Sequence, residues 1–208
     1  MTFRKTTLST MILAAALSLS GAALASDKFF AAEGKTTTYD TETEIPSGGP
    51  SSDYKLIGGW DHSQPTEGTS LEHADVNTDV TLTGNTFDEL IGGNHMRNTK
   101  LEAPAQMSIG DTKVTITGGT LGYAIGGSKA STSGDLTVEN GNVQMAIGGE
   151  TKITGKVIGG NYIKNSAATS SGAGAGKGNV SESGNIALTI EGGSFTDFVI
   201  GGSFAENY

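Results

Sequence analysis

The tripeptide Ile-Gly-Gly recurs through this chain and constrains its fold more than any other feature. Its six copies begin at Ile57, Ile91, Ile125, Ile147, Ile158 and Ile200, and an apolar residue precedes each copy. Four copies end a longer unit that reads as strand, glycine or asparagine turn, strand. These units are VTLTGNTFDELIGG from Val80, VTITGGTLGYAIGG from Val114, LTVENGNVQMAIGG from Leu136 and LTIEGGSFTDFVIGG from Leu188. A chain built this way is expected to be all-β.

Within the units, valine, leucine or isoleucine alternates with threonine, as in Val114, Thr115 and Ile116. A period of two is expected for a strand with one buried face, and β-branched side chains pack well on a pleated sheet. Gly118-Gly119 and Asn140-Gly141 then supply backbone conformations that other residues adopt only with strain. The sequence therefore predicts short strands that end in tight turns.

The spacing of the units predicts how the strands associate. The unit from Val114 starts 22 residues before the unit from Leu136, and the same step separates Ile125 from Ile147. Equal steps allow each strand to lie on the strand one coil earlier. We therefore expect a parallel β-helix, a β-solenoid of short glycine-punctuated strands, with stacked isoleucines in its core.

Three points qualify this fold. Steps longer than 22 residues are predicted to contain outward insertions, at 98–106 and at 165–184, and the second, rich in Ser, Ala and Gly, is expected to be mobile. Alternation along the strands leaves open which face each repeated isoleucine occupies. A β-sandwich of hairpins is the alternative fold, because Gly-Gly and Asn-Gly turns also close hairpins.

The N-terminus predicts export. Arg4 and Lys5 precede an apolar run from Met11 to Leu17, and Ala23-Leu24-Ala25 offers the small residues that a signal peptidase reads. The run is too short for a transmembrane helix, which needs about 20 apolar residues. We predict a signal peptide at 1–25, a flexible polar lead-in at 26–53 and a β-solenoid repeat domain at 54–208, which we expect to be incomplete at its C-terminus.

Charge and cysteine content exclude several partners and devices. The chain has 13 basic and 22 acidic residues, and loss of Arg4 and Lys5 with the signal peptide takes its formal net charge from −9 to −11. An acidic surface disfavours nucleic acid as a partner. The chain contains no cysteine, so disulfide bonds and a lipid-modified cysteine are both excluded.

Few residues have a side chain in a pattern typical of catalysis or metal binding. His62, His73 and His95 lack the spacing of zinc ligands and are expected to be exposed loop histidines. Segments 88–93 and 197–202 fit part of the calcium β-roll pattern, but the other copies have Gly122, Gln144 and Gly155 where a carboxylate is needed. We predict no catalytic, cofactor-binding or metal-binding residue.

A polysaccharide-degrading enzyme of the β-helix type is the main alternative from another class of function. Such a site needs several carboxylates, often with Lys or Arg, on one face. The only gathering of such residues that the sequence offers is borne by loops. It comprises Asp61, His62, His73, Asp75, Arg97 and Lys100. Because nothing in the sequence brings these residues together, we expect that the protein is not an enzyme.

The signal peptide, the Gly-Gly-Thr/Ser units, the repeated Ile-Gly-Gly and the absence of cysteine resemble the passenger region of Gram-negative autotransporters and related β-helical adhesins. The resemblance covers about Tyr54 to Tyr208. It implies a right-handed parallel β-helix at the cell surface. Autotransporters also carry a C-terminal barrel, which this sequence does not contain.

We therefore predict a secreted or surface-displayed β-solenoid that acts as an adhesin or as a structural or binding passenger. The alternatives are the polysaccharide-degrading enzyme and the calcium-binding β-roll. The expected location is the cell surface or the extracellular space, and the expected partner is a surface ligand that the sequence does not identify. A second expected contact is self-association through the last coil, which carries Phe195, Phe198, Ile200 and Phe204 near its end.

Overall fold

The computed structural model describes residues 28–31, 36–39, 54–62, 71–98, 105–132, 136–165 and 180–207. Throughout these ranges the chain is all-β and contains no helix, as predicted. It follows that no helix able to cross a membrane occurs in them. The predicted signal peptide at 1–25 lies outside the described residues, as do 99–104 and 166–179 of the two predicted insertions.

The strands form four sheets, which the chain visits in a fixed order from Thr36 onward. Sheet I holds β5 (Leu71–His73), β9 (Ala105–Ile109), β13 (Leu136–Asn140) and β18 (Val180–Ser183). Sheet II holds β2 (Thr36–Tyr39), β6 (Thr78–Leu82), β10 (Thr112–Ile116), β14 (Val143–Ile147) and β19 (Ile186–Ile190). Sheet III holds β1 (Lys28–Ala31), β3 (Tyr54–Ile57), β7 (Thr86–Ile91), β11 (Thr120–Ile125), β15 (Lys152–Ile153), β16 (Val157–Ile158), β20 (Ser194–Phe195) and β21 (Val199–Ile200). Sheet IV holds β4 (Asp61–His62), β8 (His95–Asn98), β12 (Lys129–Thr132), β17 (Tyr162–Asn165) and β22 (Phe204–Asn207).

Every pairing between described strands is parallel. We call each run through the sheets a layer. Layer 1 is 36–62, layer 2 is 71–98, layer 3 is 105–132, layer 4 is 136–165 and layer 5 is 180–207. A sandwich of hairpins would need antiparallel neighbours, so the alternative fold does not describe these strands.

The predicted step of 22 residues is wrong. Equivalent positions in successive layers, such as Trp60, Asn94, Ser128, Asn161 and Ser203, lie 34, 34, 33 and 42 residues apart. Val114 pairs with Val80 and Met145 in sheet II, whereas Leu136 pairs with Ala105 in sheet I. Strands of all four sheets share the same alternation, so the same letters occur at positions that do not stack.

Five of the six Ile-Gly-Gly copies occupy one register of sheet III, at Ile57, Ile91, Ile125, Ile158 and Ile200. The sixth copy is different, because Ile147 pairs with Ile116 and Ile190 in sheet II. The repeat is therefore one corner of each layer, and the copy at Ile147 is a coincidence of sequence.

Strand pairing also extends into segments that were expected to be irregular. β1 and β2 lie within the predicted lead-in and pair with β3 and β6. β9 covers the end of the first predicted insertion, and β18 covers residues 180–183 of the second. These parts of the predicted insertions are strands of sheet I, because a layer needs a fourth strand that the shorter step did not include.

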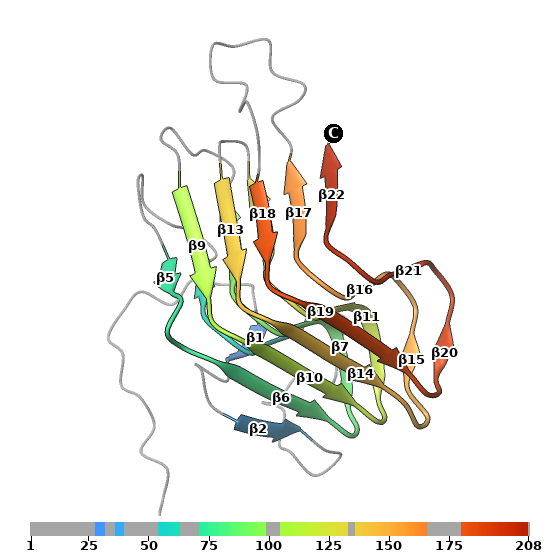
Figure 1. Ribbon diagram of the computed structural model, residues 1–208. Coiled ribbons are helices and arrows are strands. Elements are labelled where there is room, and N and C mark those ends of the chain that lie inside the picture. The colour runs from blue at the N-terminus through green and yellow to red at the C-terminus, as the bar shows by residue number, and fades with distance from the viewer. Residues whose placement is uncertain are drawn as a thin grey trace, which may run out of the picture.

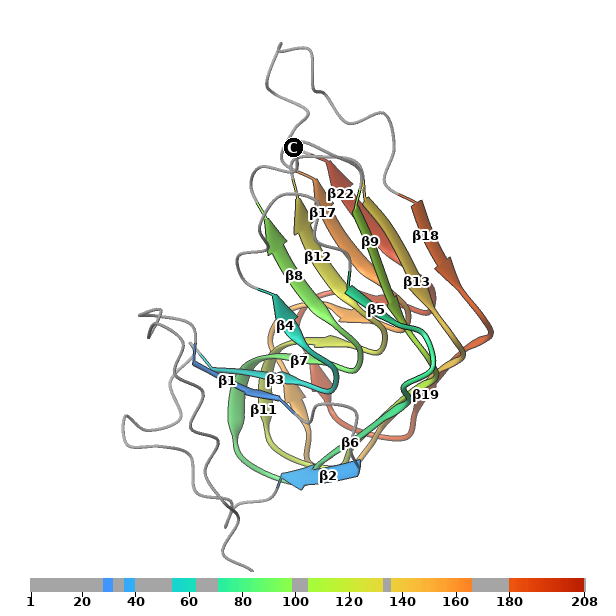
Figure 2. The ribbon, with the colours of Figure 1, turned by 90° about the vertical axis from the view of Figure 1, so that its left-hand side faces the viewer.

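The layers have two arms that meet at an angle (Figures 1 and 2). In one arm, sheets II and III enclose a core that includes Leu82, Phe87, Leu90 and Ile116. In the other arm, sheets I and IV enclose a core of Met96, Met107, Ala130, Leu136, Val138 and Ile163. Figure 1 shows β9, β13 and β18 descending into β10, β14 and β19, with β17 and β22 rising beside them.

The open question about the isoleucines is answered by a third cluster. Leu56, Leu90, Ala124 and Val157 point into the core between sheets II and III, and the isoleucine after each lies on the opposite face of its strand. Ile57, Ile91, Ile125 and Ile158 are fully buried there against Tyr162 and Phe204 of sheet IV. The isoleucines are stacked and buried, as expected, but between the outer faces of two sheets.

The paired glycines allow the two arms to approach each other. A Cβ atom on Gly92 would collide with the carbonyl oxygen of Gly126 and with Val114, and one on Gly93 would collide with Ser128. The first glycine faces sheet II in the pairs that begin at Gly58, Gly92, Gly126 and Gly159, and Thr78 donates from Oγ1 to the carbonyl of Gly92 at 2.6 Å. The close packing of arms and layers at this junction therefore depends on these positions having no side chain.

A buried polar ladder runs through the same junction, directly after each glycine pair. The backbone N–H of Asn94 donates to Oγ of Ser128 at 3.0 Å, and that of Ser128 donates to Oδ1 of Asn161 at 2.8 Å. Nδ2 of Asn94 also donates across to the carbonyl of Ser108 in sheet I at 2.8 Å. Because buried polar groups need partners, this ladder fixes the register of the layers where no apolar core exists.

Candidate functional site

Two polar surfaces flank the junction of the arms. The first, which we call the inner corner, lies where the outer faces of sheets III and IV meet. It holds the residues two places before and four places after each stacked isoleucine. These are Lys55, Glu89, Tyr123, Lys156 and Phe198, and Asp61, His95, Lys129, Tyr162 and Phe204.

A network of opposite charges occupies the middle of the inner corner. Lys129 on β12 donates from Nζ to Oε1 of Glu89 on β7, and Nζ of Lys55 on β3 lies 3.6 Å from Oε2 of the same carboxylate. Burial alone would raise the pKa of Glu89, but the two lysines lower it below its usual value. Burial lowers the pKa of Lys129, and Glu89 opposes that shift. The network links sheet III to sheet IV through charges that stabilise one another.

A histidine and a carboxylate lie beside this network. Nδ1 of His95 on β8 donates to Oδ1 of Asp61 on β4. Burial lowers the pKa of His95, Asp61 opposes the shift, and Lys55 and Lys129 add to it. The ring is therefore neutral at neutral pH, with its hydrogen on Nδ1. The prediction of an exposed loop histidine is wrong for His95, because the outer face of sheet III covers the start of β8.

The C-terminal part of the inner corner combines an ion pair with aromatic rings. Lys156 donates from Nζ to Oε1 of Glu206, and Oη of Tyr162 donates to Oε2 of Glu206 at 3.0 Å. The same ammonium lies 5.1 Å from the ring centroid of Phe198 and 5.3 Å from that of Phe204. A cation is attracted to the face of an aromatic ring, so this lysine joins two layers as well as two sheets.

The middle of the inner corner is closed to solvent. The exposed fractions of Glu89, His95 and Lys129 are 6%, 2% and 8%. A polymer has no access to groups this deeply buried. The charges of the inner corner therefore hold the two arms at a fixed angle and do not form a binding surface.

The second surface, which we call the outer corner, lies where sheet I turns into sheet II. One residue per layer forms an exposed ladder there, in the order Asn77, Asp111, Asn142 and Asn185. Oδ1 of each of the first three accepts the backbone N–H of the next, at 2.8, 2.7 and 3.0 Å. The ladder resembles the buried Asn/Ser ladder in its bonding, but it faces water.

A second row runs beside the ladder on the outer face of sheet II. Its members are Asp79, Lys113, Gln144 and Ala187, one from each of layers 2 to 5, and Nζ of Lys113 lies 2.9 Å from Oδ2 of Asp79. Between the two rows is an open groove of about 570 Å³, whose lining also includes Thr78, Thr112 and Val143. This groove is the candidate binding site.

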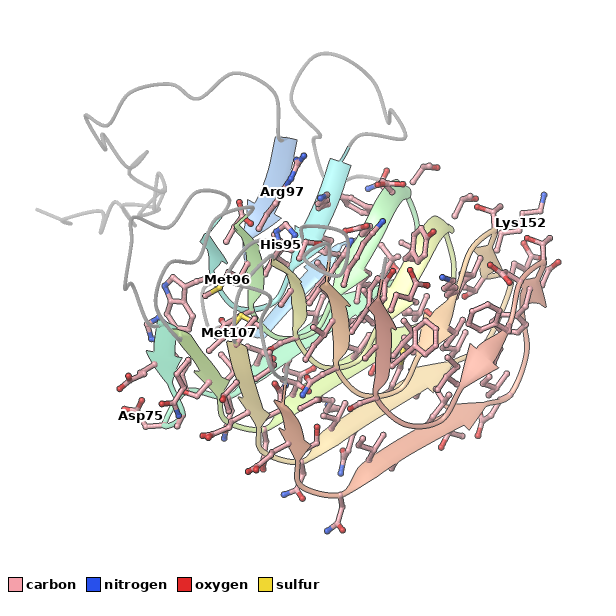
Figure 3. The ribbon with its side chains drawn as sticks, turned by 90° about the horizontal axis from the view of Figure 1, so that it is seen from above. Asp75, His95, Met96, Arg97, Met107 and Lys152 are labelled. Carbon is pink, nitrogen blue, oxygen red and sulfur yellow. The ribbon has the colours of Figure 1, made fainter. Side chains whose placement is uncertain are left out.

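The described residues of the loop-borne gathering do not all meet at one place. Asp61 meets His95, a pairing that the sequence did not predict, whereas Asp75 is exposed at one edge of the molecule, away from His95 (Figure 3). His73 stacks on Trp60, with ring centroids 3.7 Å apart. Arg97 is exposed, His62 lies in β4, and Lys100 lies outside the described residues.

The two segments that partly fit a calcium roll lie too far apart to share an ion. Asp88 is in β7 of layer 2 and Asp197 precedes β21 of layer 5. Oδ1 of Asp197 accepts the N–H of Phe198 at 2.8 Å. In the part of the chain that the structure describes, no three His, Asp or Glu side chains are placed to hold a metal ion.

The inner corner could have been found from the sequence with the correct step. At the steps of 34, 34, 33 and 42 residues that separate successive layers, the positions four after each isoleucine align as Asp61, His95, Lys129, Tyr162 and Phe204. The outer ladder recurs at slightly different steps, of 34, 31 and 43 residues from Asn77 to Asn185. With the step of 22 these rows were scattered, and His95 looked isolated.

No family model matches the chain. No significant match is found among the curated proteins or among the solved structures. The function is therefore inferred from the geometry of this chain.

Proposed function

We propose that this protein is an exported parallel β-solenoid that binds or displays at the cell surface, in the manner of autotransporter passengers and β-helical adhesins. The observation that carries the proposal is the stacking of Ile57, Ile91, Ile125, Ile158 and Ile200 in one parallel register. Each layer then corresponds to one coil of the solenoid, and equivalent positions in successive coils lie 33 to 42 residues apart.

This architecture suits binding because it turns single outward residues into rows. Each outward position recurs in the next layer at the spacing of neighbouring strands, about 4.8 Å. The rows of the outer corner cross four layers and remain exposed. A rigid scaffold with exposed rows needs little reorganisation when it meets a repetitive ligand, which lowers the entropic cost of binding.

The enzyme alternative has its best acid and base groups in the inner corner. Glu89 is held in ion pairs with two lysines, and His95 is bonded to Asp61. A general acid or base must come within hydrogen-bond reach of the proton that it moves. Since these groups are buried, we place binding before catalysis. Release of reducing ends from polysaccharides by the purified protein would instead favour the enzyme.

The experiment that tests display uses the full chain with its own N-terminus in a Gram-negative host. We expect cleavage after Ala25, measured by N-terminal sequencing, and access of added protease to the protein on intact cells or in the medium. An uncleaved protein in the cytoplasm would overturn the proposal of export. Adhesion of beads coated with purified protein to bacterial or host cell surfaces tests the binding role separately.

We also propose self-association through layer 5. Among the described strands, those of layer 5 pair only with layer 4, and Ile190, Phe198 and Val199 are exposed. Exposed strand edges with apolar side chains favour pairing with another chain. Sedimentation velocity should show concentration-dependent association, and Ile200→Lys combined with Phe204→Glu should suppress it. A monomer at all concentrations would refute the idea.

A further inference from the structure

We propose that the groove at the outer corner binds a neutral, extended polysaccharide, with about one sugar ring for each layer. The inference rests on the binding role proposed above and names the ligand class. It starts from the two rows that line the groove, the ladder of Asn77, Asp111, Asn142 and Asn185 and the row of Asp79, Lys113, Gln144 and Ala187.

The ladder leaves hydrogen-bonding groups for a ligand. Each Oδ1 from Asn77 to Asn142 is used by the backbone N–H of the next layer. Among the described residues, Nδ2 of Asn77, Oδ2 of Asp111 and the side-chain amide of Gln144 take part in no hydrogen bond, and all three residues line the groove. The groove therefore presents both donors and acceptors, as sugar hydroxyl groups require.

The orientation of these groups is already fixed. Because Oδ1 of Asp111 accepts the N–H of Asn142 at 2.7 Å, the carboxylate cannot rotate freely, and its second oxygen keeps one direction. A bond of the same kind holds Asn142, whose Oδ1 accepts the backbone N–H of Asn185 at 3.0 Å. Side chains that are ordered before binding lose less entropy when a ligand arrives. This smaller loss of entropy matters most for ligands that bind with low affinity, such as sugars.

The period of the groove selects an extended polymer. Neighbouring strands are about 4.8 Å apart, which is close to the advance of one pyranose ring along an extended β-1,4-linked chain. The four layers from Asn77 to Asn185 span about 14 Å at that spacing, room for three to four rings. A single sugar would use one layer and leave the others empty.

The charges of the groove select against a polyanion. Asp79 and Lys113 form an ion pair 2.9 Å long, and Asp111 adds a negative charge. The chain as a whole carries a formal net charge of −9. A polymer of uronic acids would be repelled by the charge of Asp111 and by the net negative charge of the chain. A neutral polymer meets none.

The test uses purified protein and three hexamers, β-1,4-linked glucose, N-acetylglucosamine and mannose, with glucose monomer and hexagalacturonate as comparison ligands. We expect at least one neutral hexamer to bind by calorimetry and to shift the side-chain amide signals of Asn142 and Gln144 in a ¹⁵N correlation spectrum. The monomer and the charged hexamer should bind at least tenfold more weakly.

Gln144→Trp fills the groove and should lower the affinity for that hexamer at least tenfold. Its matched control is Ala146→Trp, which places the same ring on the next outward position of β14, beyond the groove lining. The control should bind as the unmodified protein does, and circular dichroism should show that both variants keep their strands.

Three results would overturn the proposal: no shift with any neutral hexamer, equal loss of affinity in both variants, or stronger binding of hexagalacturonate. Binding that survives Gln144→Trp would exclude the groove as the binding site but leave the proposed binding role. Because the test uses purified protein, its outcome does not depend on export.

Discussion

The inner and outer corners of this molecule are made of the same elements, strand ends joined by short turns, yet one is closed and the other open. At the inner corner, Glu89 and His95 are buried because sheets III and IV close over them. At the outer corner, Asp111 and Asn142 form an equally regular ladder that stays exposed. The comparison shows that the direction of the bend decides whether a polar row stabilises the fold or faces a ligand.

The largest expected effect comes from closing the space at the inner bend. Gly126→Val places a Cβ against the carbonyl oxygen of Gly159 and against Val143, so we expect a loss of about 4 kcal/mol or more in the free energy of unfolding. Urea denaturation measures it. Gly201→Ala is the control, because nothing lies within 4 Å of a Cβ there. If Gly126→Val unfolds with the midpoint of the unmodified protein, the arms do not approach as described.

The next effect concerns the buried charges. Glu89→Ala leaves Lys129 buried without its partner, and removal of one member of a buried pair costs about 3–5 kcal/mol. Replacing both, as Glu89→Leu with Lys129→Met, should recover most of the loss because two apolar side chains need no partner. Thermal and urea unfolding of the three proteins check this. A single variant no less stable than the double one would contradict a closed inner corner.

A ladder residue should matter more when it is buried than when it is exposed. Asn161→Ala leaves the N–H of Ser128 without an acceptor in a site with no solvent access, and we expect a loss of about 2 kcal/mol. Asn142→Ala removes the same kind of acceptor from the N–H of Asn185 at the outer corner, where water replaces it, and should cost about 0.5 kcal/mol. Equal losses in urea denaturation would refute the difference between the corners.

Acid should weaken the inner corner in two windows. Burial lowers the pKa of His95, so the unfolded chain binds a proton more readily, and stability falls as the pH drops below about 6.5. The lowered pKa of Glu89 gives a second loss below about 4.5, as the pH falls through its folded value. Urea midpoints between pH 8 and about pH 2.5 measure both. His95→Gln should flatten the first window, and a slope unchanged in that variant would show that another group titrates there.

The smallest effect is expected at the outer corner. Lys113 and Asp79 form an ion pair with side chains 55% and 29% exposed, and exposed pairs contribute about 0.2–1 kcal/mol. Lys113→Ala should therefore change the urea midpoint slightly, and less still in high salt. A loss as large as that of Glu89→Ala would mean that the outer corner is as closed as the inner one.

The sequence predicted the strands and their buried faces well, because alternation is a local property. Val114 and Ile116 point into the core with Thr115 between them, as their period indicates. The sequence also predicted that the isoleucines stack, but it did not predict the number of residues between successive layers. Leu136 and Val114 have the same pattern and lie in different sheets, and only the pairing of distant strands distinguishes them.

The candidate groove and the inner corner were not predicted, since each gathers one residue from each of several layers. His95 meets Asp61 from 34 residues earlier, and no local pattern around His95 announces that contact. The histidine looked like a loop residue because its neighbours Asn94 and Arg97 are polar. Asn94 is in fact fully buried, as part of the ladder that joins the layers.

The sequence by itself determined that this chain forms short strands with one buried face and with recurring glycine pairs. The tertiary structure decided why those glycines are needed, which copies of Ile-Gly-Gly are equivalent and which polar rows face solvent. The physical reason is one of range. Alternation and turn propensity act between neighbours in the chain, whereas the collision of a Cβ on Gly92 with the carbonyl of Gly126 exists only once a layer lies on the next.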